Sequence, residues 1–340
     1  MDRCRSGRWR QGVLSGHKTE NLRAGVLLVV LCALLAIASC MPSVTSPTSS
    51  TSSTSSTSST SPTAPPTPSG NGVKASHVVL VVLENQNYAD VVGSANAPYL
   101  NSLIAQGALA TNYYANSHPS IGNYFMMTTG NIVSTDDAYS GTVSPPEIVS
   151  ALTAAGMSWK VYADGIPAAG YTGDSTGSYL KQHNPLAYFT DVEVTGANNI
   201  VPYSQLATDV SAMLANFVMI VGNAYDDGHD CEPTVVSCTP AVELQQADVW
   251  LARTLTQILN NADFAANGLL AVTFDESLDD NTNGGGQVAT VLVGTNVQQG
   301  YKAIGFYQHQ SLLRLMLEAQ GVSALPGASA TAPSMDEIWK

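Results

Sequence analysis

The stretch "HVVLVVLEN" (77–85) decides the fold, because it joins a continuous apolar run to two polar side chains. Residues 78–83 are all valine or leucine, with no polar residue at alternate positions. Such a run is typical of a strand that is buried on both faces, as in a parallel sheet. Glu84 and Asn85 follow at once, where the strand would leave the sheet.

Four later segments have the same continuous apolar character. They are "WKVYA" (159–163), "FVMIV" (217–221), "LLAVTF" (269–274) and "ATVLVG" (289–294). Helical patterns lie between or after these runs, at 97–108, 146–156, 240–264 and 309–321. The alternation predicts an α/β fold with a largely parallel central sheet sandwiched by helices on both faces.

Ligands of such sheets bind just past the carboxyl ends of the strands, and the predicted strand ends here are polar. Glu84-Asn85, "GNAYDDGHDC" (222–231) and Asp275-Glu276 each follow a buried run. Carboxylate and amide oxygens suit Ca²⁺, Mg²⁺ or Mn²⁺, and added imidazole would admit Zn or Fe. The pattern predicts a divalent metal ion; the alternative is a set of strand-end turns with solvated acids.

The segment "SHPSIGNYFMMTTG" (117–130) has two interpretations. In the structural one, Ser120 is the N-cap of a core helix that ends at Gly130, and His118 hydrogen-bonds nearby. In the functional one, the free N–H groups of the helix start bind an anion, and the Ser120 hydroxyl attacks phosphorus between them. The residues of this segment alone leave both open.

The block "DDGHD" (226–230) places His229 between acids. A histidine beside a carboxylate is an oriented acid or base, or a metal ligand, and the alternative is a polar loop. Cys231 and Cys238 follow, and in an exported domain such a pair predicts a disulfide rather than a metal-thiolate pair. "GGGQ" (284–287) predicts a close backbone approach or a tight turn, whereas His77 and His183 belong to no pattern.

The N-terminal region predicts export and lipidation. A basic segment precedes an apolar core at 24–38, and "IASC" (37–40) resembles a bacterial lipobox. We therefore expect a lipoprotein-type signal peptide at 1–39 and a lipid on Cys40, with an uncleaved anchor as the alternative. Residues 40–73 form a Ser/Thr/Pro-rich tether with almost nothing to bury. Residues 74–340 form one folded domain, on the outer side of the cell membrane or secreted.

The net charge of the chain limits the classes of partner that it can bind. Residues 1–39 hold six of the 13 Lys and Arg and two of the 26 Asp and Glu, so the remainder has seven basic and 24 acidic side chains, a net charge of −17. This excess of acidic side chains excludes the basic surface that nucleic-acid binding needs, and it excludes electrostatic binding to anionic lipid. A phosphate would have to be held by metal, amides and histidines rather than by an arginine cluster.

Taken together, the segments resemble the phosphoesterase family of bacterial and fungal acid phosphatases and phospholipases C, within the alkaline-phosphatase-like superfamily. The blocks that carry the resemblance, in family order, are "VVLENQNY" (81–88), "HPSIGNYFMMTTG" (118–130), "NAYDDGHD" (223–230), "TFDES" (273–277) with "GGGQV" (284–288), and "HQSLLRLMLE" (309–318). Five blocks in one order are far more specific than any one of them.

The resemblance implies metal-assisted phosphoester hydrolysis and gives roles to single residues. It implies metal ligands at Glu84, Asn85, Asp275 and Glu276. It makes Ser120 the nucleophile and Asn123 a holder of a non-bridging phosphoryl oxygen. His118 and His229 match phosphate-binding or acid/base histidines, and Asp230 and His309 are weaker matches to phosphate-binding positions.

The sequence thus predicts an exported, metal-dependent phosphomonoesterase that acts through a phosphoserine. Family members that act on phospholipids are usually longer, which favours a monoester of a small molecule over a phospholipid substrate. A phospholipase C or another phosphodiesterase is the alternative enzyme. The alternative from another class is a non-catalytic surface lipoprotein that binds a phosphorylated or glycosylated ligand.

Overall fold

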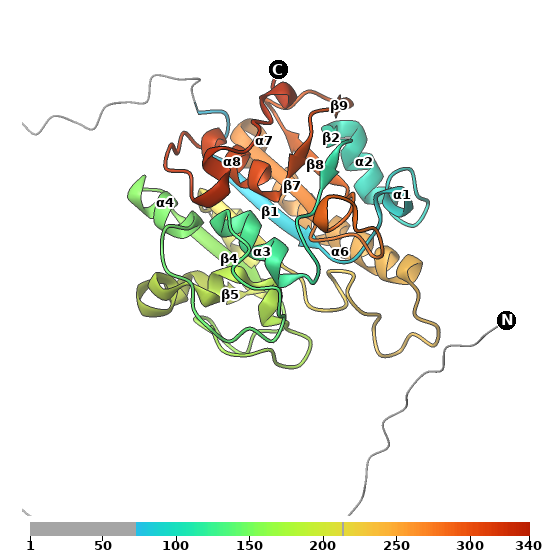
Figure 1. Ribbon diagram of the computed structural model, residues 1–340, viewed down its shortest axis with the longest axis horizontal. Coiled ribbons are helices and arrows are strands. Elements are labelled where there is room, and N and C mark those ends of the chain that lie inside the picture. The colour runs from blue at the N-terminus through green and yellow to red at the C-terminus, as the bar shows by residue number, and fades with distance from the viewer. Residues whose placement is uncertain (1–72, 213) are drawn as a thin grey trace, which may run out of the picture. The chain divides into compact units, whose positions relative to one another are not determined.

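The computed structural model describes residues 73–212 and 214–340 (Figure 1). The predicted signal peptide, the lipidation of Cys40 and the tether up to residue 72 lie outside the described residues. Within these residues, no helix has the length and apolar character needed to cross a membrane.

The core is an eight-stranded sheet with the order β5-β4-β6-β1-β7-β8-β2-β9. The strands are β1 (His77–Leu83), β2 (Ala108–Ala110), β4 (Trp159–Ala163), β5 (Ile200–Pro202), β6 (Phe217–Val221), β7 (Gly268–Phe274), β8 (Thr290–Gly294) and β9 (Tyr301–Ala303). Every residue of β6 and β7, and six of the seven of β1, are buried, because helices cover the sheet. The five apolar runs therefore form strands, as predicted.

The sheet is mixed rather than parallel throughout. β5, β4, β6, β1 and β7 form parallel pairs, but β8 runs antiparallel to both β7 and β2. The connection from β7 to β8 contains only the short 3₁₀ helix Thr282–Gly284. A parallel return needs a longer crossover, usually through a helix, so β8 begins at the edge where β7 ends and runs back beside it.

The helices form two groups. They are α1 (Tyr88–Val91), α2 (Pro98–Gln106), α3 (Ile121–Thr129), α4 (Ile148–Ala154), α5 (Leu206–Ala212), α6 (Pro240–Leu259), α7 (Ala262–Asn267) and α8 (His309–Ala319). α3 and α4 both contact α8, whereas α2, α5 and α7 contact α6. In Figure 1, α3 and α8 lie in front of the strands and α6 passes behind them.

Two details differ from the sequence prediction. The helix expected at 240–264 is two helices, because the Asn261 side chain accepts from the N–H groups of Asp263 and Phe264 and so starts α7. A second, two-stranded sheet pairs β3 (Tyr113–Tyr114) with β10 (Tyr307–Gln308). Strands of two or three residues leave too little pattern to be predicted.

Candidate active site

The three polar strand ends meet at one edge of the sheet. β1 lies between β6 and β7 and is parallel to both, so their carboxyl ends are neighbours. The Asn85 backbone N–H donates to Asp275 Oδ1 over 3.1 Å, and the Glu84 backbone N–H donates to the Asp227 carbonyl over 2.9 Å. The prediction that these segments converge is confirmed.

The buried carboxylate of Glu84 is the centre of the cluster. Its Oε2 accepts hydrogen bonds from Ser120 Oγ and from Asn85 Nδ2, both over 3.0 Å. Its Oε1 accepts from the Tyr124 hydroxyl over 2.6 Å. Ser120 and Tyr124 lie one turn apart at the start of α3, so one helix supplies donors to both oxygens of the same carboxylate.

Ser120 occupies the N-cap position of α3, as the structural interpretation expects, but its side chain does not cap the helix. Its backbone is already helical (φ −45°, ψ −51°), and its hydroxyl makes no bond to the helix amides. The Ile121 N–H donates instead to Asp137 Oδ1 over 3.0 Å. The Ser120 hydroxyl is therefore directed into the carboxylate cluster, and one amide expected to hold a phosphoryl oxygen is already bonded.

A second group of contacts lies around Glu276. His118 Nδ1 is 3.1 Å from Glu276 Oε1, and Asn123 Nδ2 donates to Glu276 Oε2 over 3.2 Å. Asn123 Nδ2 also donates to the Ser117 carbonyl over 2.8 Å, so both of its N–H bonds are in use. A phosphoryl oxygen that binds Asn123 would take the place of Glu276 Oε2.

The glycines of "GGGQ" allow this loop to touch the segment before His118. A Cβ on Gly284 would lie 2.2 Å from the Asn116 carbonyl oxygen, and a Cβ on Gly285 would lie 2.5 Å from that of Ser117. Gly284 and Gly286 also have φ values of 112° and 80°. The close backbone approach and the tight turn are thus both present, and they support the segment that leads to Ser120.

Two residues of the cluster were not predicted: His183 and, as a functional residue, Asp227. Asp227 Oδ2 accepts from His183 Nδ1 over 2.7 Å, and both side chains are buried. His183 Nε2 lies 3.3 Å from Glu84 Oε1, in a geometry that makes no hydrogen bond. Asp227 belonged to a polar block already singled out, but His183 comes from an irregular segment with no pattern.

His229 and its neighbours lie at the edge of the cluster. One ligand atom each of Glu84, His183 and His229 lie within 4.8 Å of one another. The Asp230 side chain is 60% exposed, and its Oδ2 is 3.4 Å from His229 Nδ1. Cys231 and Cys238 form the predicted disulfide, so they are not a pair of free thiolates.

His309 lies behind the cluster rather than in it. Its Nε2 contacts the Asp275 carbonyl oxygen over 2.7 Å, and its Nδ1 contacts the Tyr113 hydroxyl over 3.0 Å. The ring is fully buried, and burial lowers its pKa to about 4. With both nitrogens bonded to the protein, His309 supports the Asp275 backbone and offers no free atom to a phosphate.

The carboxylates of the cluster are crowded. Burial, followed by the charge of Asp227, raises the pKa of Glu84 well above its usual value. Burial and the charge of Glu84 do the same to the pKa of Asp275. Burial, followed by the charge of Asp275, raises the pKa of Glu276 to about 8, although His118 partly offsets this. The protein alone does not neutralise this group of acids.

The residues of the cluster fit a divalent cation. Asp275 Oδ2 and His183 Nε2 are buried without a hydrogen-bond partner, and both are ligand atoms. Among the described residues, no Lys or Arg bonds to Glu84, Ser120, Asp275 or Glu276. A cation would supply the missing positive charge, and the mixed set of carboxylates and imidazoles suits several divalent metals.

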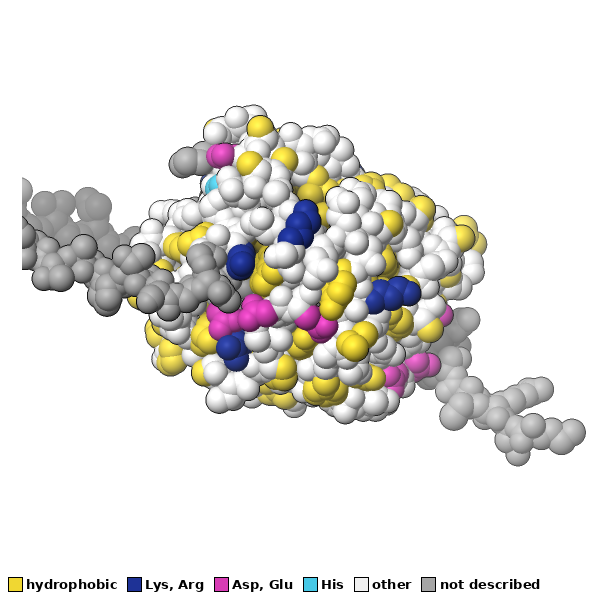
Figure 2. All heavy atoms as spheres, turned by 90° about the horizontal axis from the view of Figure 1, so that it is seen from above, with side chains coloured by type: hydrophobic (Ala, Val, Ile, Leu, Met, Phe, Trp, Pro, Cys, Tyr) yellow, Lys and Arg dark blue, Asp and Glu magenta, His cyan; other side chains and the backbone are white. Residues whose placement is uncertain are grey.

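Basic side chains are also sparse elsewhere. On the face shown in Figure 2, Lys and Arg side chains lie singly among uncharged and acidic ones.

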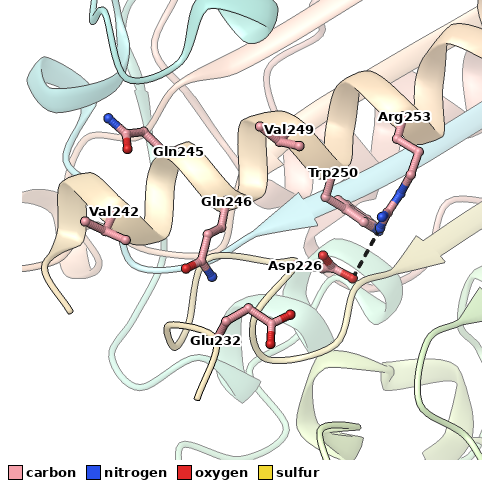
Figure 3. Close-up of a pocket in the computed structure, with 8 residues that line it drawn as sticks. All are labelled: Asp226, Glu232, Val242, Gln245, Gln246, Val249, Trp250 and Arg253. Atoms are coloured by element: carbon pink, nitrogen blue, oxygen red, sulfur yellow. Dashed lines mark ion pairs between the residues drawn. The ribbon is translucent and has the colours of Figure 1, made fainter. Parts of the chain in front are cut away.

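A separate cavity of about 320 Å³ lies between α6 and the loop that carries Asp226 and Glu232 (Figure 3). Arg253 reaches to 3.7 Å from Asp226 there, and none of the eight lining residues belongs to the cluster around Ser120.

Comparison with known sequences identifies the family. A family profile described as "Phosphoesterase family" matches residues 94–323. A phosphatidylinositol-3-phosphatase of Mycobacterium tuberculosis is 32% identical over 270 residues, which cover 78% of this chain and 83% of that protein. A probable acid phosphatase of Kluyveromyces lactis is 30% identical over 260 residues, which cover 71% of this chain but only 57% of the yeast protein.

Solved structures agree in fold. A protein of the alkaline phosphatase superfamily from Vibrio parahaemolyticus matches with a TM-score of 0.54 and 14% identity, over 76% of this chain and 70% of that one. The lipoteichoic acid synthase LtaP from Listeria monocytogenes matches with a TM-score of 0.52 and 11% identity, over 74% and 73%. Identities this low bear on the fold alone. Because the sequence comparisons are much stronger, they decide the family: the chain belongs to the phosphoesterase family and is a hydrolase of phosphoester bonds.

Proposed function

We propose that the chain is an exported, metal-dependent phosphomonoesterase of the acid-phosphatase type that works through a phosphoserine at Ser120. One observation carries this proposal: the buried Ser120 hydroxyl donates to Glu84 inside a cluster of carboxylates and imidazoles. A serine placed at a metal-binding carboxylate is suited to be a nucleophile. The relatives named as acid phosphatases support the reaction class.

The proposed metal ligands are drawn from both halves of the cluster. The sequence proposes Glu84, Asn85, Asp275 and Glu276 and offers His229 either as a ligand or as an acid, and the contacts of the cluster add His183 as a candidate donor. A divalent ion bound there would neutralise part of the carboxylate charge, lower the pKa of a neighbouring hydroxyl and stabilise negative charge on phosphoryl oxygens.

In the first step, Ser120 Oγ attacks phosphorus and the alcohol leaves from the opposite side. The hydrogen bond to Glu84 directs the serine proton to that carboxylate, which accepts it. The departing oxygen takes a proton from a histidine, and we retain both candidates. His118 Nδ1 pairs with Glu276, and its Nε2 contacts the Asp280 carbonyl oxygen over 3.1 Å, a contact that it would exchange for the departing oxygen; its side chain is 27% exposed. The His229 side chain is 36% exposed at the edge of the cluster.

In the second step, water attacks the phosphorus of phosphoserine and inorganic phosphate leaves. Ser120 Oγ recovers from Glu84 the proton that it gave up in the first step as its bond to phosphorus breaks, and the same histidine accepts the proton of the water. Asn123 is the proposed ligand of a non-bridging oxygen, for which it exchanges its contact with Glu276. The protonation states of serine, Glu84 and histidine are thereby restored.

The test of the reaction class is a comparison of three substrates at saturating Mn²⁺ or Zn²⁺. These are 4-nitrophenyl phosphate, bis(4-nitrophenyl) phosphate, and phosphatidylinositol 3-phosphate in micelles. The lipid is included because one relative is named a phosphatidylinositol-3-phosphatase. Metal-dependent release of phosphate from the monoester is the expected result. Activity on the diester alone would favour the phosphodiesterase, and phosphate binding without turnover of any substrate would favour a binding lipoprotein.

Export and lipidation are proposed from residues 1–40 alone. In a bacterial host, the full-length chain should incorporate labelled palmitate and become accessible to protease added outside the cytoplasmic membrane. Cys40→Ser is the matched control, because it removes the acceptor thiol and leaves the apolar segment unchanged. Equal labelling of both chains would contradict the anchor, and a protected domain would contradict export.

A further inference from the structure

We propose that Tyr124 is a positioning residue of the active site, which fixes Glu84 and the His183 ring in their working orientations. This inference rests on the proposed function of the cluster. Two independent contacts carry it. The Tyr124 hydroxyl donates to Glu84 Oε1 over 2.6 Å, and its ring stacks on His183 with centroids 5.3 Å apart and planes 7° apart.

The two oxygens of the Glu84 carboxylate accept hydrogen bonds from different residues. Tyr124 occupies Oε1, while Oε2 accepts from Ser120 over 3.0 Å. A carboxylate anchored at one oxygen cannot rotate freely, so the other oxygen stays aligned with the nucleophile. Because the phenol is neutral, it holds the charged carboxylate without adding a second charge to the site.

The stacked ring restricts the imidazole in a different way. Asp227 fixes the Nδ1 side of His183 over 2.7 Å, but one hydrogen bond leaves rotation about its own axis open. The parallel face of Tyr124 restricts that rotation, and His183 Nε2 then stays 3.3 Å from Glu84 Oε1 without a partner of its own. Tyr124 thus orients a carboxylate and an imidazole that come from distant parts of the chain.

Two substitutions of Tyr124 test its hydrogen bond to Glu84 and its stacking on His183 separately. Tyr124→Phe keeps the stacked ring and removes the hydroxyl, whereas Tyr124→Leu removes both. Tyr162→Phe is the matched control: Tyr162 is also fully buried and donates to a carboxylate, Asp209, over 2.8 Å, but outside the cluster. Loss of groups that orient metal ligands typically lowers metal affinity or activity about 10- to 100-fold.

We expect Tyr124→Phe to lower kcat for 4-nitrophenyl phosphate about 10- to 100-fold with little change in KM, and to weaken Mn²⁺ binding measured by calorimetry on the metal-free protein. Tyr124→Leu should lower both kcat and Mn²⁺ affinity further, and Tyr162→Phe should change neither of them. In a Glu84→Gln background, the Tyr124→Phe change should cost much less, because the two residues act as one unit.

The role of Tyr124 and the proposed function of the site are contradicted by different results. Wild-type kcat and wild-type Mn²⁺ affinity in a folded Tyr124→Phe protein would overturn it. Failure of Tyr124→Phe to fold while Tyr162→Phe folds would also overturn it, because the hydroxyl would then serve stability. Full activity of Ser120→Ala would instead remove the proposed nucleophile, and the calorimetric effect of Tyr124→Phe would remain measurable.

Discussion

Ser120 Oγ lies 3.0 Å from Glu84 Oε2 and donates a hydrogen bond to it, although the two residues are 36 positions apart in the chain. The bond joins the carboxyl end of β1 to the start of α3. It gives the serine an acceptor for its proton, and both side chains are buried.

Ser120→Ala should lower kcat by about a thousandfold or more, because a nucleophile cannot be replaced by binding interactions alone. The protein should remain folded, since the hydroxyl caps no helix amide. Turnover of 4-nitrophenyl phosphate and a thermal melt check both statements. Ser311→Ala is the control, because Ser311 is a buried helical serine outside the cluster, and it should keep wild-type turnover. A similar loss in both variants would point to disturbed packing.

Asp275→Asn should weaken binding of Mn²⁺ by at least about tenfold, because it removes a charge and alters a buried oxygen that has no other partner. Binding is measured by calorimetry after removal of metal with a chelator. Asp248→Asn is the matched control, since Asp248 is a buried acid that accepts from the backbone of α2 instead. Undiminished affinity in Asp275→Asn would exclude this carboxylate as a ligand.

The metal-free protein should lose stability as the pH rises from about 6.5 to about 8. Glu276 has its pKa raised from 4.5 to about 8, so in this range the folded state binds more protons than the unfolded state. The raised pKa values of Glu84 and Asp275 act in the same direction. Below pH 6.5, the lowered pKa of His309 opposes this trend, because the unfolded histidine becomes protonated first.

Urea denaturation at several pH values in the presence of chelator measures this effect. Saturating Mn²⁺ should flatten the slope, because the cation takes over the neutralising role of the protons. Glu276→Gln should remove part of the slope in the metal-free protein. A free energy of unfolding that is constant or increases over this range would contradict the proposed crowding of carboxylates.

His309→Asn should lower the free energy of unfolding by about 2–3 kcal/mol, because it leaves the Tyr113 hydroxyl and the Asp275 carbonyl without their buried partner. The sequence resemblance assigns His309 weakly to phosphate binding instead. Binding of inorganic phosphate by the metal-loaded variant distinguishes the two roles. Unchanged stability with lost phosphate affinity would favour the phosphate role.

The sequence predicted the central part of the fold because buried strands have continuous apolar runs. The direction of β8 was not predictable, since an apolar run indicates burial but not orientation. The order of strands around β1 follows from crossover connections, and it brought Glu84, Asp227 and Asp275 to one edge. Short strands such as β2 and β9 carry too few residues for any periodicity.

The candidate site was only partly predictable, because strand topology places some of its residues and tertiary packing places the others. Residues that directly follow strands, such as Glu84 and Asp275, are placed by the topology of the sheet. His183 lies in a 3₁₀ turn of a long irregular segment, and its place beside Glu84 depends on tertiary packing against Tyr124. The residues of 117–130 leave the direction of the Ser120 hydroxyl open, because a local pattern does not show that the buried carboxylate of Glu84 competes with the helix amides for it.

The phosphoserine mechanism is tested by an acid quench of the enzyme during turnover of 4-nitrophenyl phosphate, followed by peptide mass spectrometry. We expect a phosphorylated peptide that contains Ser120, formed within the first turnover and absent from Ser120→Ala. Turnover with no phosphate on Ser120 at any quench time, together with full activity of Ser120→Ala, would rule out Ser120 as the nucleophile.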